Sequence, residues 1–291
     1  MSFRKHKKQK TLNEVGNTGK ENFLYKLQSF RKPTFLLLLT LLIFMVAGMA
    51  GEKLPSTKPV VEERPTMRVL FIGNSYTYHN NMPLIFENLA QHDPSSHFYI
   101  KTDMFVEGGA RLLDLWNNPL KNDILTREKW DYVVLQPQSL WAMTDMKFKN
   151  NDRALELWAK AIRSIGAKPV FFMTWPRHAN STDYRNPDLP FMGSPMQMYE
   201  NIARRTAYLT KRHDLMTVPI GDYWFYTTIN NLDIPLYDAD GSHPSIYGSS
   251  LTAMLLYTAL VDKTLDDIKY KPNAAKAAQY NEILSLAAQD L

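Results

Sequence analysis

Residues 67–77 have the sequence MRVLFIGNSYT, in which a short apolar run ends at Gly73 and passes directly into polar residues. A run of four to eight apolar residues bounded by a turn signal is typical of a strand buried on both faces. Between Met82 and His92 the apolar residues then recur at helical spacing. The stretch therefore predicts a buried strand, a turn that carries Ser75, and a helix.

Strand-like and helix-like segments continue to alternate after this first pair. We expect strands at residues 97–106, 131–136, 168–174 and 215–220, and helices at about 151–165, at about 196–212 and from about 246. Strands separated by helices predict an α/β fold, in which helices cover both faces of a parallel sheet. The sequence contains no repeat of 20–50 residues, so residues 67–291 are expected to form one domain.

The basic residues of the chain are concentrated at its N-terminus. Residues 1–33 contain nine Lys or Arg and two Glu, whereas the rest of the chain contains 25 basic and 27 acidic residues. The net charge of +5 therefore comes from a basic tail, which we expect to be cytoplasmic. A nucleic-acid partner is not expected, because the domain itself is slightly acidic.

Residues 34–51 follow this tail and contain an uncharged, Leu-rich run of 17 residues. This length is at the lower limit for a helix that crosses a membrane, which is about 17–25 residues. The segment is therefore expected to be a transmembrane anchor. A cleaved signal peptide is the alternative, because Gly48 and Ala50 are small residues at plausible positions before a cleavage site. In both cases the basic flank stays in the cytoplasm and the domain lies outside it, membrane-anchored or secreted. Residues 52–66 contain three prolines among charges and are expected to be an extended linker.

Several classes of site are excluded or disfavoured by composition. The chain has no cysteine, which excludes disulfides, thiol catalysis and thiolate metal sites. No HExxH motif or cluster of carboxylates occurs in the sequence, so we expect neither a metal nor a cofactor.

Two short motifs carry the residue types that nucleophilic catalysis needs. Ser75 follows the first predicted strand, at a position where backbone N–H groups of the next helix can face developing negative charge. Asp240 and His243, in the sequence DGSH, provide a base for a serine and a carboxylate to orient that base. Each motif alone has a simpler reading. Gly-Asn-Ser is ordinary turn composition, and Asp240 or Ser242 could merely cap the following helix.

Taken together, GNSYT at residues 73–77 and DGSHP at residues 240–244 resemble the motifs of the SGNH (GDSL-type) hydrolase superfamily. The resemblance extends over about residues 67–262. It implies a flavodoxin-like three-layer α/β/α sandwich and ester hydrolysis through an acyl-enzyme. It further implies that Ser75 is the nucleophile, with His243 and Asp240 completing the triad. Thr77 argues against the other large esterase fold, whose nucleophile elbow is G-x-S-x-G.

The resemblance also implies an oxyanion hole with three donors. They are the Ser75 N–H, a glycine N–H after the second strand, and an asparagine side chain after the third. Gly109 is our first choice for the glycine. The third strand ends in LQPQS, so Gln138 stands where the family has asparagine and Gln136 where it has glycine. A glutamine carboxamide offers the same N–H donors as asparagine.

Additional substrate-binding candidates lie beside these motifs. Asn74 and Tyr76 flank the serine, Gln136 precedes the third-strand loop, and Trp141 and Trp175 could be aromatic platforms for a sugar ring, with core packing as the alternative. Arg177 and His178 lie in a long loop, where we expect exposed positions.

The predicted function is a serine esterase for small O-acyl esters, with O-acetyl groups on carbohydrate as the favoured substrate. The alternatives are an O-acyltransferase that acts on glycan hydroxyls and an inactive glycan-binding module.

Overall fold

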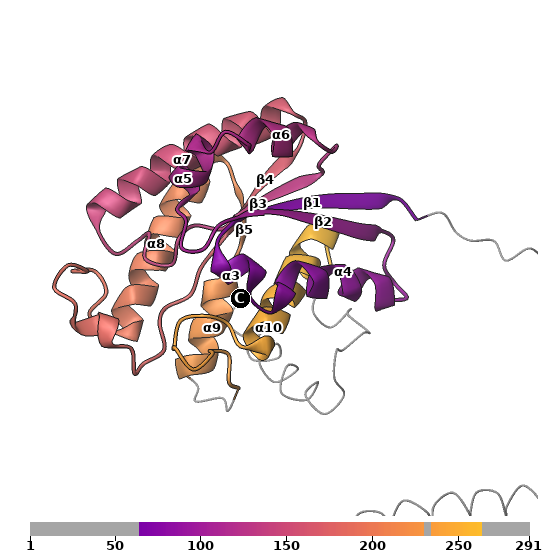
Figure 1. Ribbon diagram of the computed structural model, residues 1–291. Helices are drawn as coiled ribbons and strands as arrows, with labels where there is room; N and C mark the ends of the chain where they lie inside the picture. The colour runs from indigo at the N-terminus through magenta and orange to yellow at the C-terminus, as the bar shows by residue number, and fades with distance from the viewer. Residues whose placement is uncertain (1–63, 230–233, 264–291) are drawn as a thin grey trace, which may run out of the picture. The chain divides into compact units, whose positions relative to one another are not determined.

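The computed structural model describes residues 64–229 and 234–263 (Figure 1). The segment predicted as a membrane anchor or signal peptide, most of the predicted linker, and residues 264–291 lie outside these ranges. Within the described ranges, no helix has both the length and the apolar character that crossing a membrane requires.

The centre of the fold is one five-stranded sheet in which every pairing is parallel. The strands are β1 (Thr66–Gly73), β2 (Tyr99–Val106), β3 (Tyr132–Leu135), β4 (Lys168–Phe172) and β5 (Met216–Val218), in the spatial order β2-β1-β3-β4-β5. In β1, Phe71 lies between Met104 of β2 and Val134 of β3. The loops that follow these three strands therefore leave the same edge of the sheet side by side.

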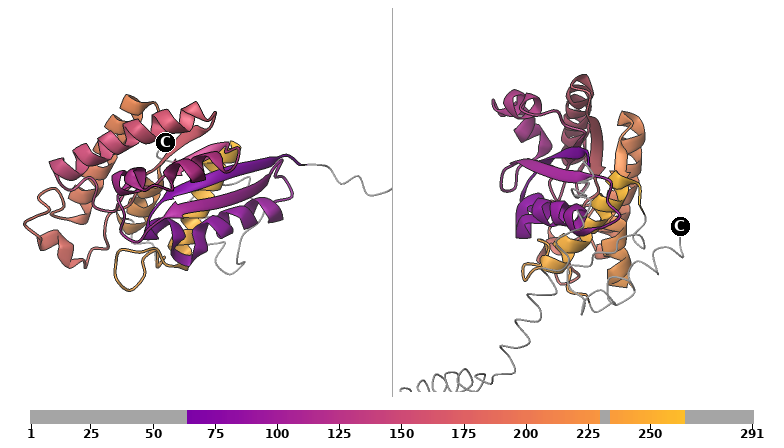
Figure 2. Two further views of the ribbon diagram at one scale, coloured as in Figure 1. Left: turned by 45° about the horizontal axis from the view of Figure 1, so that its top comes forward. Right: turned by 90° about the vertical axis from the view of Figure 1, so that its right-hand side faces the viewer.

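Helices cover both faces of the sheet, as the alternating pattern predicts (Figures 1 and 2). One face is covered by α4 (Met82–His92), α9 (Ile220–Ile229) and α10 (Ile246–Val261). The other is covered by α5 (Leu112–Asn117), α6 (Lys121–Thr126), α7 (Asp145–Ser164) and α8 (Pro195–His213). The arrangement is a three-layer α/β/α sandwich.

Successive side chains of the central strand supply two separate cores. Val69 and Phe71 belong to the core shared with α4, α9 and α10, whereas Leu70 and Ile72 belong to the core on the opposite face. This division follows from the period of two in a strand, which sends consecutive side chains to opposite faces. It explains why the first strand is apolar at nearly every position.

The strand order changes direction between β1 and β3, because β2 lies on the outer side of β1 and the later strands extend the other way. In open α/β sheets such a switch point leaves a crevice at the carboxyl ends of the strands, where ligands bind. The short helix α3 (Ser75–Tyr78), the 3₁₀ turn η1 (His79–Asn81) and the loops after β2 and β3 meet at this edge.

Several elements differ from the predicted ones. Helix α7 begins at Asp145, about six residues before the predicted start, because the Thr144 side chain accepts a hydrogen bond from the Lys147 N–H and caps it. Its first turns are mostly polar, so hydrophobic spacing did not reveal them. Helices α5, α6 and α9 were not predicted, and the last predicted strand is shorter than expected because α9 begins at Ile220.

Candidate active site

Ser75 is the first residue of α3 and is held there by the side chain of its neighbour Asn74. The Asn74 Oδ1 accepts the Tyr76 N–H at 3.1 Å, and its Nδ2 donates to the Ala110 carbonyl oxygen at 3.0 Å. The Asn74 N–H in turn donates to the Gln136 Oε1 at 2.9 Å. The turn that presents Ser75 is therefore tied to the loops after both neighbouring strands.

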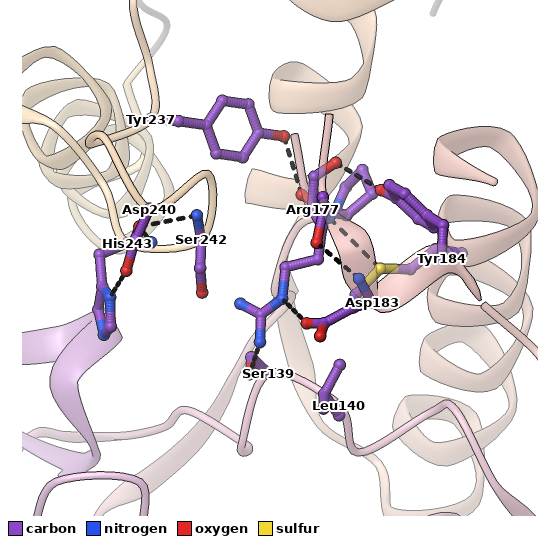
Figure 3. Close-up of polar contacts among 12 residues, drawn as sticks. Ser139, Leu140, Arg177, Asp183, Tyr184, Tyr237, Asp240, Ser242 and His243 are labelled. Carbon is purple, nitrogen blue, oxygen red and sulfur yellow. Dashed lines mark hydrogen bonds and ion pairs between the residues drawn. The ribbon is translucent and has the colours of Figure 1, made fainter. Parts of the chain in front are cut away.

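The three residues predicted as a triad lie within one hydrogen-bonded chain. The Ser75 Oγ lies 2.8 Å from the His243 Nε2, and the His243 Nδ1 lies 2.5 Å from the Asp240 Oδ2. Asp240 and His243 come from the same loop (Figure 3). When Asp240 is ionised, the His243 Nδ1 carries the proton that bonds to it, which leaves Nε2 free to accept the hydroxyl proton of Ser75.

Asp240 is strongly biased toward its ionised form. Burial alone raises the pKa of this carboxyl, but hydrogen bonds from the His243 ring and from the backbone N–H groups of Ser242 and His243 lower the pKa of Asp240 to about 2. Both of these N–H groups lie 2.9 Å from the Asp240 Oδ1. The same bonds hold the loop in the conformation that directs His243 toward Ser75.

Two rings pack against His243 and restrict its orientation. The His79 ring stacks on it with centroids 5.0 Å apart, and the Tyr76 ring meets it edge-on at 5.6 Å. The His79 Nε2 lies 3.2 Å from an oxygen of Asp238, so a second His–Asp pair lies beside the first.

The backbone N–H groups of Ser75 and Gly109 are available to donate hydrogen bonds to a substrate. Gly109, in the loop after β2, has a φ of +70°, and a Cβ placed there would meet no atom within 4 Å. Glycine is therefore favoured at this position by its conformation and not by lack of space. Among the described residues, no group accepts a hydrogen bond from the N–H of Ser75 or Gly109.

The two glutamines after β3 have different surroundings. Gln136 is only 1% exposed, and its Oε1 accepts hydrogen bonds from the Asn74 N–H and from the Thr77 hydroxyl. The Gln136 Nε2 donates to the Pro137 carbonyl. Gln136 is therefore not a substrate-binding residue as predicted, and it instead supports the turn that carries Ser75. The Gln138 Oε1 accepts the Leu140 N–H at 2.9 Å, and Gln138 borders a cavity together with Gly109.

The predicted aromatic platforms are wrong, because both rings are buried. Trp175 is 0% exposed and lies between the rings of Tyr76 and Trp224, with centroid distances of 4.5 and 3.9 Å. Trp141 is 2% exposed, and its indole N–H donates to the Thr174 hydroxyl. Trp175 presents no open face on which a sugar ring could stack, and only a small part of Trp141 borders a cavity.

Asn74 and Tyr76 were likewise predicted to bind substrate, and both are buried with their polar groups bonded within the chain. The Tyr76 hydroxyl lies 2.9 Å from the Ser242 Oγ, next to His243. Both positions therefore indicate a supporting role: Asn74 ties the turn that carries Ser75 to the loops after β2 and β3, and Tyr76 joins that turn to the loop that carries Asp240 and His243.

Arg177 is a central residue of this region that the sequence did not reveal. We expected an exposed side chain, but Arg177 is 9% exposed, and its guanidinium lies 3.3 Å from Asp183 and 3.1 Å from the Ser139 Oγ (Figure 3). The guanidinium also lies against the Tyr76 hydroxyl. It thereby connects the loop after β4 with the loop after β3 and with the residue next to Ser75. An arginine in a polar loop carries no sequence signal of such burial.

The described ranges contain no group of three or more His, Asp or Glu side chains placed to hold a metal ion.

Neither a protein-family model nor a curated protein sequence matches this chain. Solved structures do. One, described as a "putative SGNH hydrolase" from Slackia heliotrinireducens, is 27% identical with a TM-score of 0.57, over 67% of this chain and 99% of that one.

Two more distant structures share the fold. A DUF4886 family protein from Bacteroides uniformis is 20% identical with a TM-score of 0.61, over 78% of this chain and 96% of that one. A "putative GDSL-like lipase" from Parabacteroides merdae is 14% identical with a TM-score of 0.52, over 67% and 96% of the two chains. From the fold and from the likeness to the Slackia structure across almost its whole length, we conclude that this chain belongs to the SGNH (GDSL-type) hydrolase superfamily.

Proposed function

We propose that this chain is a serine esterase that hydrolyses small O-acyl esters through an acyl-enzyme on Ser75. The observation that carries the proposal is the continuous chain of contacts from the Ser75 Oγ through the His243 ring to the Asp240 carboxylate. A serine hydroxyl becomes an effective nucleophile only when a base accepts its proton, and this geometry supplies that base.

In the first half of the reaction, the Ser75 Oγ attacks the ester carbonyl carbon while its proton moves to the His243 Nε2. The resulting imidazolium is stabilised by Asp240, and it returns the proton to the alcohol oxygen as the bond between that oxygen and the acyl carbon breaks. In the second half, water attacks the acyl-enzyme and gives a proton to His243. The proton then returns to the Ser75 Oγ as the carboxylic acid leaves.

The negative oxygen of the tetrahedral intermediate needs hydrogen-bond donors fixed in advance. The N–H groups of Ser75 and Gly109 are the proposed backbone donors, since both lack an acceptor among the described residues. Gln138 is the proposed third donor. Its Oε1 is held by the Leu140 N–H, and its Nε2 has only a long contact of 3.4 Å with the Ser139 Oγ.

The burial of Trp141 and Trp175 removes the aromatic argument for an acetylated carbohydrate. The proposed substrate is therefore an ester with a small acyl group, and a sugar is not part of it.

Labelling with a fluorophosphonate probe tests the nucleophile directly. We expect the probe to modify Ser75 and the Ser75→Ala variant to lose both labelling and hydrolysis of 4-nitrophenyl acetate, while its circular dichroism spectrum is unchanged. Ser164→Ala is the matched control, because Ser164 is an exposed residue at the end of α7. Labelling that persists in folded Ser75→Ala, or that maps to Ser139 or Ser242, contradicts the assignment.

A further inference from the structure

A cavity of about 200 Å³ lies beside the proposed oxyanion hole. Its lining comes from the loops after β2 and β3 and from the first turns of α5 and α7. Gly109 and Gln138 border it on the side of the oxyanion hole, and Lys147 and Asn151 border it from α7. Gly109 and Gln138 are also proposed donors to the oxyanion. A substrate group bound in this cavity would therefore lie next to the reacting carbonyl.

The charged groups in this lining are basic. Arg111 is already paired with Asp114 at 2.6 Å. Lys147 is not compensated in this way, since no acidic group of the described residues pairs with its ammonium. Partial burial, followed by repulsion from Arg111 and Arg177, lowers the pKa of Lys147. A bound anion would relieve this repulsion, and no acidic side chain lines the cavity to compete with it.

Asn151 provides a second and independent indication of a polar ligand. It lies one helical turn after Lys147 on α7, so the two side chains share one face of that helix. Asn151 is 6% exposed, and its Nδ2 is buried without a hydrogen-bond partner in the described part of the chain. An unsatisfied buried donor costs about 1–3 kcal/mol, and a ligand oxygen in the cavity would offset that cost.

We propose that this cavity binds an anionic, carboxylate-bearing group of the substrate, with Lys147 as its cationic partner and the Asn151 amide as a further donor. This inference rests on the proposed esterase function and specifies its substrate class. Leu112, Leu113 and Trp141 give the cavity apolar walls that suit a short carbon chain. Water in the liquid occupies about 30 Å³ per molecule, so the volume accommodates roughly seven non-hydrogen atoms, the number in a succinyl group.

Matched pairs of esters test the proposal with the full chain. Monoethyl succinate and ethyl butyrate have acyl groups of equal carbon length with and without a carboxylate, and 3-carboxyphenyl and 3-carbamoylphenyl acetate make the same comparison in the alcohol half. We expect the acidic member of one pair to have the higher kcat/KM. Lys147→Met should reduce that acid-to-neutral ratio by about 10- to 100-fold, the usual scale for losing a hydrogen bond to a charged group. The pair that responds identifies the half of the ester that carries the anion.

Lys149→Met is the matched control, because Lys149 is an exposed lysine on the same helix and does not line the cavity. It should leave the ratio unchanged. A ratio in both pairs that does not respond to Lys147→Met overturns the inference, even if the enzyme hydrolyses the neutral esters well.

A binding measurement separates failure of this inference from failure of the proposed function. Calorimetric titration of succinate and of 3-hydroxybenzoate, the acidic products of the two pairs, into Ser75→Ala tests the cavity without turnover. At least one should bind saturably, and adding Lys147→Met should weaken that binding at least tenfold. If neither binds, the cavity does not take a carboxylate. If one binds but no ester is hydrolysed and no serine probe reacts, the esterase function fails instead.

Discussion

At the scale of single residues, the two glutamines after β3 have different roles. Gln136 supports the turn that carries Ser75, whereas Gln138 is the proposed donor to the oxyanion. We expect Gln138→Ala to lower kcat by roughly 100- to 1,000-fold with little change in KM, the usual effect of losing one oxyanion donor. The protein should unfold at nearly the same urea concentration as the wild type, because the Gln138 carboxamide is held by the Leu140 N–H and a long Ser139 contact. Steady-state kinetics and urea unfolding together measure both effects.

Gln136→Ala is the comparison for that variant. It removes the acceptor of the Asn74 N–H and of the Thr77 hydroxyl, both of them buried. The free energy of unfolding should therefore fall by about 1–3 kcal/mol, the cost of leaving buried donors unsatisfied. If Gln136→Ala shows the pure kcat defect and Gln138→Ala does not, the assignment of the two glutamines is reversed. If neither shows it, the hole consists of backbone N–H groups alone.

The sequence indicated the catalytic triad but not the burial of Trp175 and Arg177. Different features of the fold determine the positions of these two groups of residues. Ser75, Asp240 and His243 could be predicted to approach one another, because their two motifs together resemble those of the SGNH superfamily, although the loop of Asp240 and His243 follows α9 and not a strand. The burial of Trp175 and Arg177 could not be predicted in this way. Trp175 packs against α9 and the loop that carries Asp240 and His243, whereas Arg177 packs against the loop after β3, and all of these segments are distant in sequence.

At the scale of elements, a buried ion pair joins the ends of α4 and α10. The Asp93 carboxylate, which follows α4, is 0% exposed and lies 2.8 Å from the Lys263 Nζ and 2.9 Å from the Tyr257 hydroxyl. Burial raises the pKa of this carboxyl, but hydrogen bonds from Lys263, Ser95 and Tyr257 lower the pKa of Asp93 to about 2.

The sign of the resulting pH dependence follows from this shift. An aspartate in an unfolded chain has a pKa of about 3.9, so the folded state binds the Asp93 proton more weakly. The stabilisation is present above about pH 4 and is lost as the pH falls toward 2. We expect Asp93→Asn to lower the free energy of unfolding by roughly 3 kcal/mol at pH 7, the scale for leaving one charge of a buried pair unpartnered. The difference from wild type should shrink between pH 4 and 2 in urea titrations.

Asp123→Asn is the control for this prediction, because Asp123 pairs with Arg127 on the surface of α6. Exposed pairs contribute about 0–1 kcal/mol, so this variant should unfold nearly like the wild type. An Asp93→Asn variant that is equally stable, or that loses the same stability at every pH, contradicts the role given to the ion pair.

Helices and strands with a clear hydrophobic pattern could be predicted from the sequence, and those without one could not. All five strands and the helices α4, α8 and α10 were found near their predicted places, because apolar runs and helical spacing mark them directly. Helices α5 and α6 are only six residues long, too short for a periodic pattern to emerge. The first turns of α7 depend on the Thr144 cap, which is a local hydrogen bond and not a pattern of burial.

At the scale of the whole molecule, the charge distribution leads to a prediction about location. Residues 1–33 carry a net charge of +7, an uncharged run of 17 residues follows from Phe35, and the remaining basic and acidic residues nearly balance. Basic residues that flank an apolar segment are retained on the cytoplasmic side of a membrane, so we propose that residues 67–291 lie outside the cytoplasm.

A reporter that is active only in the cytoplasm, fused after Leu291, should therefore be silent, and alkaline phosphatase, active only outside it, should be active at the same position. The control begins at Met67 and lacks the basic and apolar segments, so it should reverse both signals.

Changing the basic residues between Arg4 and Lys32 to glutamine tests the physical reason, because the cytoplasmic reporter should then gain signal as orientation is lost. Fractionation separates the two alternatives, since an uncleaved anchor keeps the full-length chain in the membrane fraction and a cleaved signal peptide releases a shorter chain. A bright cytoplasmic reporter on the unmodified chain would show that the domain is not exported and that the charge asymmetry has another cause.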